Sequence, residues 1–327
     1  MLTPRENFIR YLKNEPYEWV PSSFDQVRFL PSMIIDNVAR GFVFQQNPVP
    51  AEQYGGKDSF GVEWVYEPSA RGSIDLEPLF ADPDDLENWE SLLKFPDLSK
   101  LDWEGCAKEN AEYLKTDKLI MSTIFTGFFE RLISLVGFEN AAMALVDEDQ
   151  EDAVRGLFDR LADFYVELGQ YLHRYFNVEW IEVHDDWGTQ RSTMFSTAVH
   201  EELIAPYIKK VVDGFHAEGI FFEMHSCGMI EPLMPNLIAT GCDTWKGQQN
   251  NDKQKLVETY GDQFKFCVDV RNDAIHTDEE VEAFFREILK IYNGKPVWYA
   301  LSRGFTPAQC RRVQEILREE GIVYPVA

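Results

Sequence analysis

The 327-residue sequence lacks any run of eighteen apolar residues, the length that a membrane-spanning helix requires. Its first residues, "MLTPRENFIRYLKNEP", also lack the basic-then-apolar order of a signal peptide, and Thr3, Pro4 and Glu6 indicate a capped helix instead. The five cysteines are odd in number and scattered without a close pair, which is typical of a reducing compartment rather than of a disulfide framework. We therefore expect a cytoplasmic protein with no membrane association.

Positive charge is scarce. The chain has 31 Lys and Arg against 56 Asp and Glu, a formal net charge of −25, which disfavours nonspecific binding to nucleic acid or to an anionic membrane. No glycine-rich phosphate loop follows any expected strand, which argues against a nucleotide-binding sheet. The sequence contains neither HExxH nor a nucleophile-elbow motif. These absences leave a small molecule as the expected ligand.

What the sequence does contain, from about residue 118 onward, is a regular alternation of short β-rich runs with longer amphipathic segments. Helices are expected at 148–173, 198–217, 230–239 and 278–292. Strands are expected at 19–25, 118–125, 180–187, 219–226, 243–248, 264–270 and 296–302. Alternation sustained this long predicts an α/β fold, a (β/α)8 TIM barrel, with an open doubly wound sheet as the alternative.

The segment 47–100 breaks the alternation, because it is rich in Pro, Gly, Asp and aromatic residues. We interpret it as an insertion that forms a hairpin and loops near the barrel mouth. The sequence shows no internal repeat, low-complexity tract or linker. A single domain over residues 1–327 is therefore expected.

Polar residues gather where the expected strands end, which is where a β/α barrel carries its active site. In "GIFFEMHSCG", strand alternation places Glu223, His225 and Cys227 on one face. Carboxylate, imidazole and thiolate are all zinc ligands, so these three residues are a candidate metal site. The alternative is a hydrogen-bonded Glu–His pair beside an inert cysteine.

A second strand end, "WIEVHDDWG", presents His184 and Asp186 on one face and Asp185 and Trp187 on the other. A carboxylate here can act as a general acid or base, orient a histidine, or cap the next helix. Arg303, in "LSRGF" at the end of a late strand, is the expected partner of an acid or the clamp of a substrate anion.

Longer stretches carry a resemblance to a known family. They are "VHDDWGTQRSTMFSTAVHEELIAPYIKKVVDGFHAEG", "HSCG", "LMPNLIATGCD", "LVETYGDQFKF" and the N-terminal "TPRENF". Together they resemble the uroporphyrinogen decarboxylase superfamily over most of the chain. The resemblance implies a (β/α)8 barrel that performs either decarboxylation or corrinoid-dependent methyl transfer.

Two branches of that superfamily fit this sequence less well. True decarboxylases carry an arginine-rich segment that ends in a QAGRY-like motif, whereas "VPSSFDQVRFLPSMI" here has one arginine. Methyltransferases that act on thiols hold zinc with His-x-Cys and a late-strand Cys. This chain keeps His225 and Cys227 but has Ser302 and Arg303 where the last Cys is expected.

The segment "FTGFFERLISLVGFENAAMAL" is similar to the methyltransferase I component of anaerobic O-demethylases. That resemblance implies transfer of a methyl group from an aryl methyl ether to the Co(I) of a corrinoid (cobalamin) carried on a partner protein, with zinc as a further cofactor. A non-catalytic barrel that binds a small molecule is the remaining alternative. The implied catalytic residues are His225, Glu223, Asp186 and His184, and the implied substrate-binding residues are Asp25, Phe128, Phe129, Trp187 and Arg303.

Overall fold

The computed structural model describes residues 1–34, 36, 41–69, 72–274 and 277–325, with backbone alone at 302 and 303. The chain divides into two compact units. Unit 1 comprises Met1–Val27, Thr116–Leu119 and Asp243–Ala327, and unit 2 comprises Arg28–Lys115 and Ile120–Cys242. The single domain expected over 1–327 stays a prediction.

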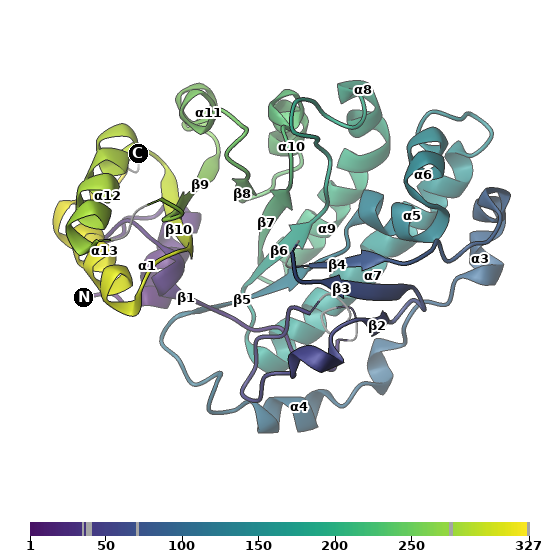
Figure 1. Cartoon of the computed structure of the whole chain (residues 1–327), viewed down its shortest axis with the longest axis horizontal. Helices are drawn as coiled ribbons and strands as arrows, with labels where there is room; N and C mark the ends of the chain where they lie inside the picture. The colour runs from purple at the N-terminus through teal and green to yellow at the C-terminus, as the bar shows by residue number, and fades with distance from the viewer. Residues whose placement is uncertain (35, 37–40, 70–71, 275–276, 326–327) are drawn as a thin grey trace. The chain divides into compact units, whose positions relative to one another are not determined.

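Unit 2 is built on three parallel strands that pair in chain order, β5 (Leu119–Ile124), β6 (Trp180–His184) and β7 (Phe221–Ser226) (Figure 1). Its longest helix is α7 (Glu151–Phe176), which ends at Asn177 because that residue adopts the left-handed conformation and caps the helix. The other helical elements are α5 (Phe128–Val136), α6 (Phe138–Ala144), α8 (Thr197–Val199), a π-helical turn (His200–Ile204), α9 (Ala205–Ala217), η6 (Glu231–Leu233) and α10 (Met234–Ala239).

The insertion belongs to unit 2 and contains the expected hairpin. Strands β2 (Gly56–Lys57), β3 (Glu63–Glu67) and β4 (Gly72–Asp75) form a small antiparallel sheet. Short helices follow or precede it: η2 (Ala51–Gln53), η3 (Pro83–Asn88), α3 (Trp89–Leu92), η4 (Leu98–Lys100) and α4 (Trp103–Glu109). Asp58 ties the sheet to α5, because its carboxylate accepts the indole N–H of Trp64 and pairs with Arg131 at 2.7 Å.

Unit 1 contains a second parallel set, β8 (Thr244–Gly247), β9 (Lys265–Arg271) and β10 (Val297–Arg303), again paired in chain order. Its helices are α1 (Pro4–Leu12), α11 (Lys253–Tyr260), α12 (Asp278–Tyr292) and α13 (Pro307–Glu320). The capping box of Thr3 and Glu6 starts α1 as predicted.

The prediction of a strand at 19–25 is wrong. Residues Ser23–Asp25 form a 3-10 turn, η1, and only Gln26–Arg28 are a strand, β1. The turn forms because Ser22 and Asp25 make a capping box, in which the Asp25 carboxylate accepts the N–H of Ser22 at 2.9 Å.

Parallel strands alternate with helices in both units, and within neither unit does the strand order reverse as a doubly wound sheet requires. The predicted α/β fold of the (β/α)8 type is therefore confirmed. Among the helices of the described residues, none combines the length and apolar character needed to cross a membrane.

Candidate metal centre

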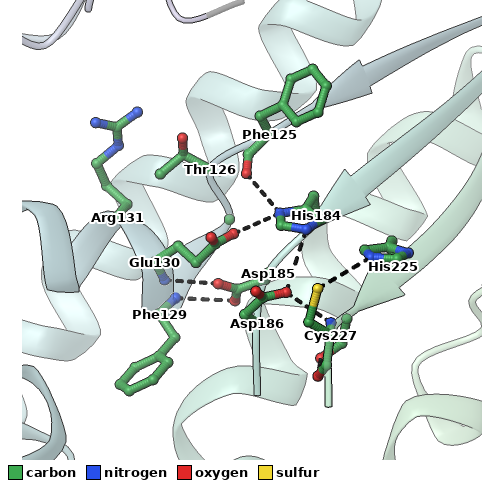
Figure 2. Close-up of polar contacts among 12 residues, drawn as sticks. Phe125, Thr126, Phe129, Glu130, Arg131, His184, Asp185, Asp186, His225 and Cys227 are labelled. Atoms are coloured by element: carbon green, nitrogen blue, oxygen red, sulfur yellow. Dashed lines mark hydrogen bonds and ion pairs between the residues drawn. The ribbon is translucent and has the colours of Figure 1, made fainter. Parts of the chain in front are cut away.

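Four side chains with metal-ligand chemistry converge in unit 2, where β6 and β7 end (Figure 2). His184, Asp186, His225 and Cys227 each offer one ligand atom, and these atoms lie within 4.8 Å of one another. The strand register explains the convergence, because His184 lies directly beside His225 and their rings stack with centroids 4.8 Å apart.

Two glycines bring the loops after these strands into contact. A Cβ atom added to Gly228, whose φ is +78°, would overlap the carbonyl group of Gly188. The loops are joined further by hydrogen bonds, since the Asp186 carboxylate accepts the N–H of Cys227 at 2.8 Å. Both motifs therefore end in glycine because the two backbones touch there.

The orientation of His184 is fixed by a carboxylate from another element. Its Nδ1 lies 2.9 Å from Oε2 of Glu130 and 3.1 Å from the carbonyl oxygen of Phe125. Both neighbours are acceptors, so Nδ1 carries a proton, and Nε2 faces Asp186, at 3.4 Å from Oδ1. A carboxylate on the far nitrogen is the usual support of a histidine that binds metal.

Asp185 points away from the four and holds the start of α5. Its carboxylate accepts the backbone N–H groups of Phe128, Phe129 and Glu130, at 3.1, 3.0 and 2.8 Å, and the indole N–H of Trp187 at 2.8 Å. It therefore caps the helix that carries Glu130 and so places the partner of His184.

Gly127 makes this contact between Asp185 and α5 possible. A Cβ atom on Gly127 would lie 2.5 Å from the Cβ of Asp185, too close for any side chain.

The charges of the cluster are strongly coupled. Burial alone would lower the pKa of His184, but the Glu130 and Asp186 carboxylates outweigh it and raise that pKa well above the ordinary histidine value. Burial raises the pKa of Asp186, yet His184 prevails and the net shift is downward. Burial raises the pKa of the Cys227 thiol. A cation at these atoms competes with the protons of His184 and Cys227, so its affinity increases with pH.

The donor set fits zinc. Two imidazoles, one thiolate and one carboxylate are all ligands that Zn²⁺ accepts, and four is its usual coordination number in proteins. Hard cations such as Mg²⁺ prefer oxygen ligands alone and are poorly matched to this set.

Glu223, predicted as a third metal ligand, lies outside the group. It is on the same face of β7 as His225 but two residues earlier, is 1% exposed, and is register partner of Glu182. His184 and Asp186, which the sequence suggested for acid–base roles, stand beside His225 and Cys227 instead.

The predicted aromatic contacts lie in the core. Phe128, Phe129 and Trp187 are fully buried, and Phe129 packs against Phe195 while Trp187 packs against His200. Their substrate role stays a prediction.

A different aromatic pair lies beside the cluster. The rings of Phe42 and Phe125 stack with centroids 4.8 Å apart, and Phe125 is 6.3 Å from the ring of His184. Sequence reasoning missed Phe42, Phe125 and Glu130. The available signal was that the last two follow the end of β5, where barrel loops present functional groups.

Asp25 and Arg303 belong to unit 1. Asp25 is buried and engaged in its turn, where its carboxylate accepts the indole N–H of Trp19 at 3.1 Å and the Oγ–H of Ser22 at 3.2 Å. The backbone of Arg303 lies in β10, and its side chain is outside what the structure describes. The substrate contacts predicted for both residues stay predictions.

Parallel β/α units with a cluster of metal-ligand side chains at their strand ends define a barrel protein with a candidate catalytic centre. The chain belongs to the uroporphyrinogen decarboxylase (URO-D) family, whose model matches residues 58–308. That range includes all four residues of the cluster and Glu130. The family consists largely of enzymes, decarboxylases and methyltransferases among them.

No curated protein matches the chain. Among solved structures, a sugar phosphate isomerase/epimerase from Parabacteroides distasonis ATCC 8503 is 9% identical, with 68% of this chain and 80% of that chain covered and a TM-score of 0.35. An Old Yellow Enzyme from Pichia sp. AKU4542 is 11% identical, with 69% and 68% covered and a TM-score of 0.40. A 2,3-dimethylmalate lyase is 11% identical, with 98% of this chain and 90% of that chain covered and a TM-score of 0.37. Likenesses this weak carry no argument about function.

Proposed function

We propose that this protein moves a methyl group from a methoxylated aromatic compound to the Co(I) of a corrinoid carried by a partner protein, in an anaerobic O-demethylase system. The observation that carries the proposal is the cluster of His184, Asp186, His225 and Cys227 next to the stacked rings of Phe42 and Phe125. The cluster suits the chemistry of an ether oxygen, and the ring pair suits a flat apolar substrate.

The reaction needs help at oxygen. The methyl carbon accepts the electron pair of Co(I), the C–O bond breaks, and its electron pair stays on the oxygen of a phenolate, which then takes up a proton. Phenolate is a poor leaving group from an unactivated ether, so its developing charge must be neutralised. Zinc held by three of the side chains of His184, Asp186, His225 and Cys227 would keep one position open and would supply Lewis-acid stabilisation of that oxygen.

The chain's own residues have separable roles in this proposal. Glu130 holds a proton on Nδ1 of His184, so that Nε2 is the nitrogen available to the cation. The buried Glu223 on β7 is the proposed proton carrier, and His225 takes that role in the alternative where it does not hold the metal. Phe125 and the partly buried Phe42 provide a flat wall that excludes water from one side.

Decarboxylation of a tetrapyrrole is less well supported. A substrate with many carboxylates needs unpaired cations, but Arg28 pairs with Glu182 at 3.3 Å and Arg131 pairs with Asp58 at 2.7 Å. Glu130 and Asp186 add negative charge to the centre itself.

The test is anaerobic incubation of the protein with reduced cob(I)alamin, free or on a corrinoid protein, and a panel of methoxylated phenols. We expect the absorbance of methylcobalamin to grow together with a stoichiometric amount of demethylated phenol. Cys227→Ser and His225→Ala should abolish this signal, whereas Lys209→Ala, an exposed change on α9, should preserve it. Absence of methylcobalamin across the panel, with active corrinoid controls, would refute the proposal. The protein would then be tested for the reaction of the thiol-methylating branch, which is methyl transfer from methylcobalamin to a thiol.

A further inference from the structure

Unit 2 contains a cavity of about 190 Å³ that the metal centre does not use. Its walls come from α7, from the insertion and from the end of β5 with the loop that follows. The apolar part of the lining includes Phe60, Leu98, Ile124, Phe164, Leu168 and Leu172. Thr126 and Arg131 also line it, and in Figure 2 their side chains point away from His184.

The polar lining of the cavity includes Arg131, Asp36 and Asp97. Arg131 and Asp36 form a buried network with Asp58, which is not part of the lining. Arg131 is 1% exposed, and its guanidinium lies 2.7 Å from Asp58 and 3.5 Å from Asp36. Asp36 also accepts the hydroxyl of Thr126 at 3.2 Å. The Arg131 Nε finds no hydrogen-bond acceptor among the described residues. Arg131 and Asp36, both at the wall of the cavity, favour a polar group of a ligand at that wall.

The shape and walls of the cavity favour a small ring. An apolar cavity of about 150 Å³ is already large enough to take up benzene, so this volume suits a ring with one or two small substituents. Phe60 and Phe164 meet edge to face with centroids 5.3 Å apart and offer ring surfaces to such a guest. The face of Phe60 is also covered by the Arg131 guanidinium at 4.2 Å, which keeps that wall rigid.

The charges of the network select against an anion. Asp36, Asp58 and Asp97 stand against Arg131 and Lys100, the partner of Asp97, so one net negative charge lies beside an apolar space of low dielectric constant. A carboxylate guest would lose its hydration and meet that charge, whereas a phenolic hydroxyl can donate to Asp36 and accept from Arg131.

We propose that this cavity is a binding site for a small uncharged phenol, separate from the metal centre. The site takes a single aromatic ring with a neutral hydroxyl and rejects the corresponding benzoate. The inference does not depend on methyl transfer, since it rests on the cavity between α7 and the insertion.

Calorimetric titration of the full chain with phenol and with benzoate tests the proposal. We expect phenol to bind the cavity and benzoate to bind it at least about tenfold more weakly, since each tenfold corresponds to about 1.4 kcal/mol. The cavity-filling change Leu168→Trp should weaken phenol binding at least about tenfold. The matched change Leu92→Trp, at an exposed position on α3, should leave it unchanged.

A variant of the metal centre separates this site from the first one. His225→Ala should retain phenol binding, because His225 does not line the cavity. If Leu168→Trp fails to fold, as far-UV circular dichroism would show, Leu172→Phe fills the same space. Equal affinity for phenol and benzoate, undiminished phenol binding by a folded filling variant, or loss of phenol binding in His225→Ala would each overturn the proposal.

Discussion

Among individual residues, Glu130 has the most specific role, because it holds a proton on Nδ1 of His184 and leaves Nε2 as the nitrogen that can bind metal. Glu130→Gln keeps the size of the side chain but weakens this support. We expect zinc affinity to fall by about 10- to 100-fold, the usual effect of removing such a partner, with the fold intact. Competition against a chromophoric chelator measures the affinity. Glu139→Gln, an exposed change on the neighbouring helix α6, is the control, and equal affinities of the two variants would exclude the role.

Asp185 serves the fold instead of the chemistry. Asp185→Ala removes the acceptor of three backbone N–H groups and one indole N–H in the interior. We expect the free energy of unfolding to fall by roughly 2–4 kcal/mol, which combines a lost helix cap with unsatisfied buried donors. Urea denaturation measures it. Asp185→Asn retains one acceptor oxygen and should lose less; an equal loss for both variants would contradict this account.

His200 makes stability depend on pH. It is completely buried, neither ring nitrogen has a hydrogen-bond partner among the described residues, and burial lowers its pKa to about 4. Because the unfolded state takes up the proton first, at a pKa of about 6.5, stability falls as pH decreases from about 6.5 to 4. The loss attributable to His200 should reach about 3 kcal/mol.

The difference between wild type and His200→Leu isolates this effect, since the other titrating groups are shared. Unfolding free energies at several pH values between 7 and 4 should show a smaller slope for the variant. Parallel curves for the two proteins would refute the assignment.

At the scale of elements, regular patterns were readable and local exceptions were not. The apolar period of residues 278–292 predicted α12 to its last residue, and the structure adds the capping box of Thr277 and Glu280 at its start. The apolar run at 19–25 misled, because hydrogen bonds between Ser22 and Asp25 favour a turn over a strand. The pattern of apolar residues indicates burial and helical or strand period. It does not indicate side-chain hydrogen bonds such as those between Ser22 and Asp25, because these depend on the positions of individual atoms.

The candidate site was also predictable only where it depends on regular strand geometry. Parallel neighbouring strands bring their carboxyl ends to one edge, so His184, Asp186, His225 and Cys227 were expected to be close. The participation of α5, which carries Glu130, was not expected. It depends on a close approach of Gly127 to Asp185 that the spacing of residues in the sequence does not indicate.

The contact between the loops after β6 and β7 gives a prediction at this scale. Gly228→Ala would place a methyl group into the carbonyl of Gly188 at a left-handed backbone position. We expect a loss of at least about 2 kcal/mol in the free energy of unfolding, from overlap and backbone strain together, with weaker zinc binding.

Gly219→Ala is the matched control for Gly228→Ala, because Gly219 has nearly the same φ, +77°, but no atom within 4 Å of an added Cβ. It should lose only about 1 kcal/mol from the left-handed conformation and keep full zinc affinity. Both quantities come from urea denaturation and chelator competition. Equal behaviour of the two variants would mean that the loop contact contributes nothing.

For the whole molecule, the net charge of −25 is the dominant property. Mutual repulsion of the carboxylates opposes compaction, and added salt screens it over about 10 Å at 0.1 M. We expect the thermal midpoint to increase between about 10 mM and 300 mM salt, equally with NaCl and KCl. A constant or falling midpoint would show that favourable ion pairs, such as that of Lys209 and Asp213, outweigh the repulsion.

The division into units also orders events during synthesis on the ribosome. Unit 1 draws on both ends of the chain, whereas unit 2 lies entirely between Arg28 and Cys242, and it holds every member of the candidate metal centre. The last of these residues to be translated is Cys227. A nascent chain that ends before β8 therefore already contains all four candidate ligands and both glycines, so the proposed zinc site takes none of its ligands from β8, β9 or β10.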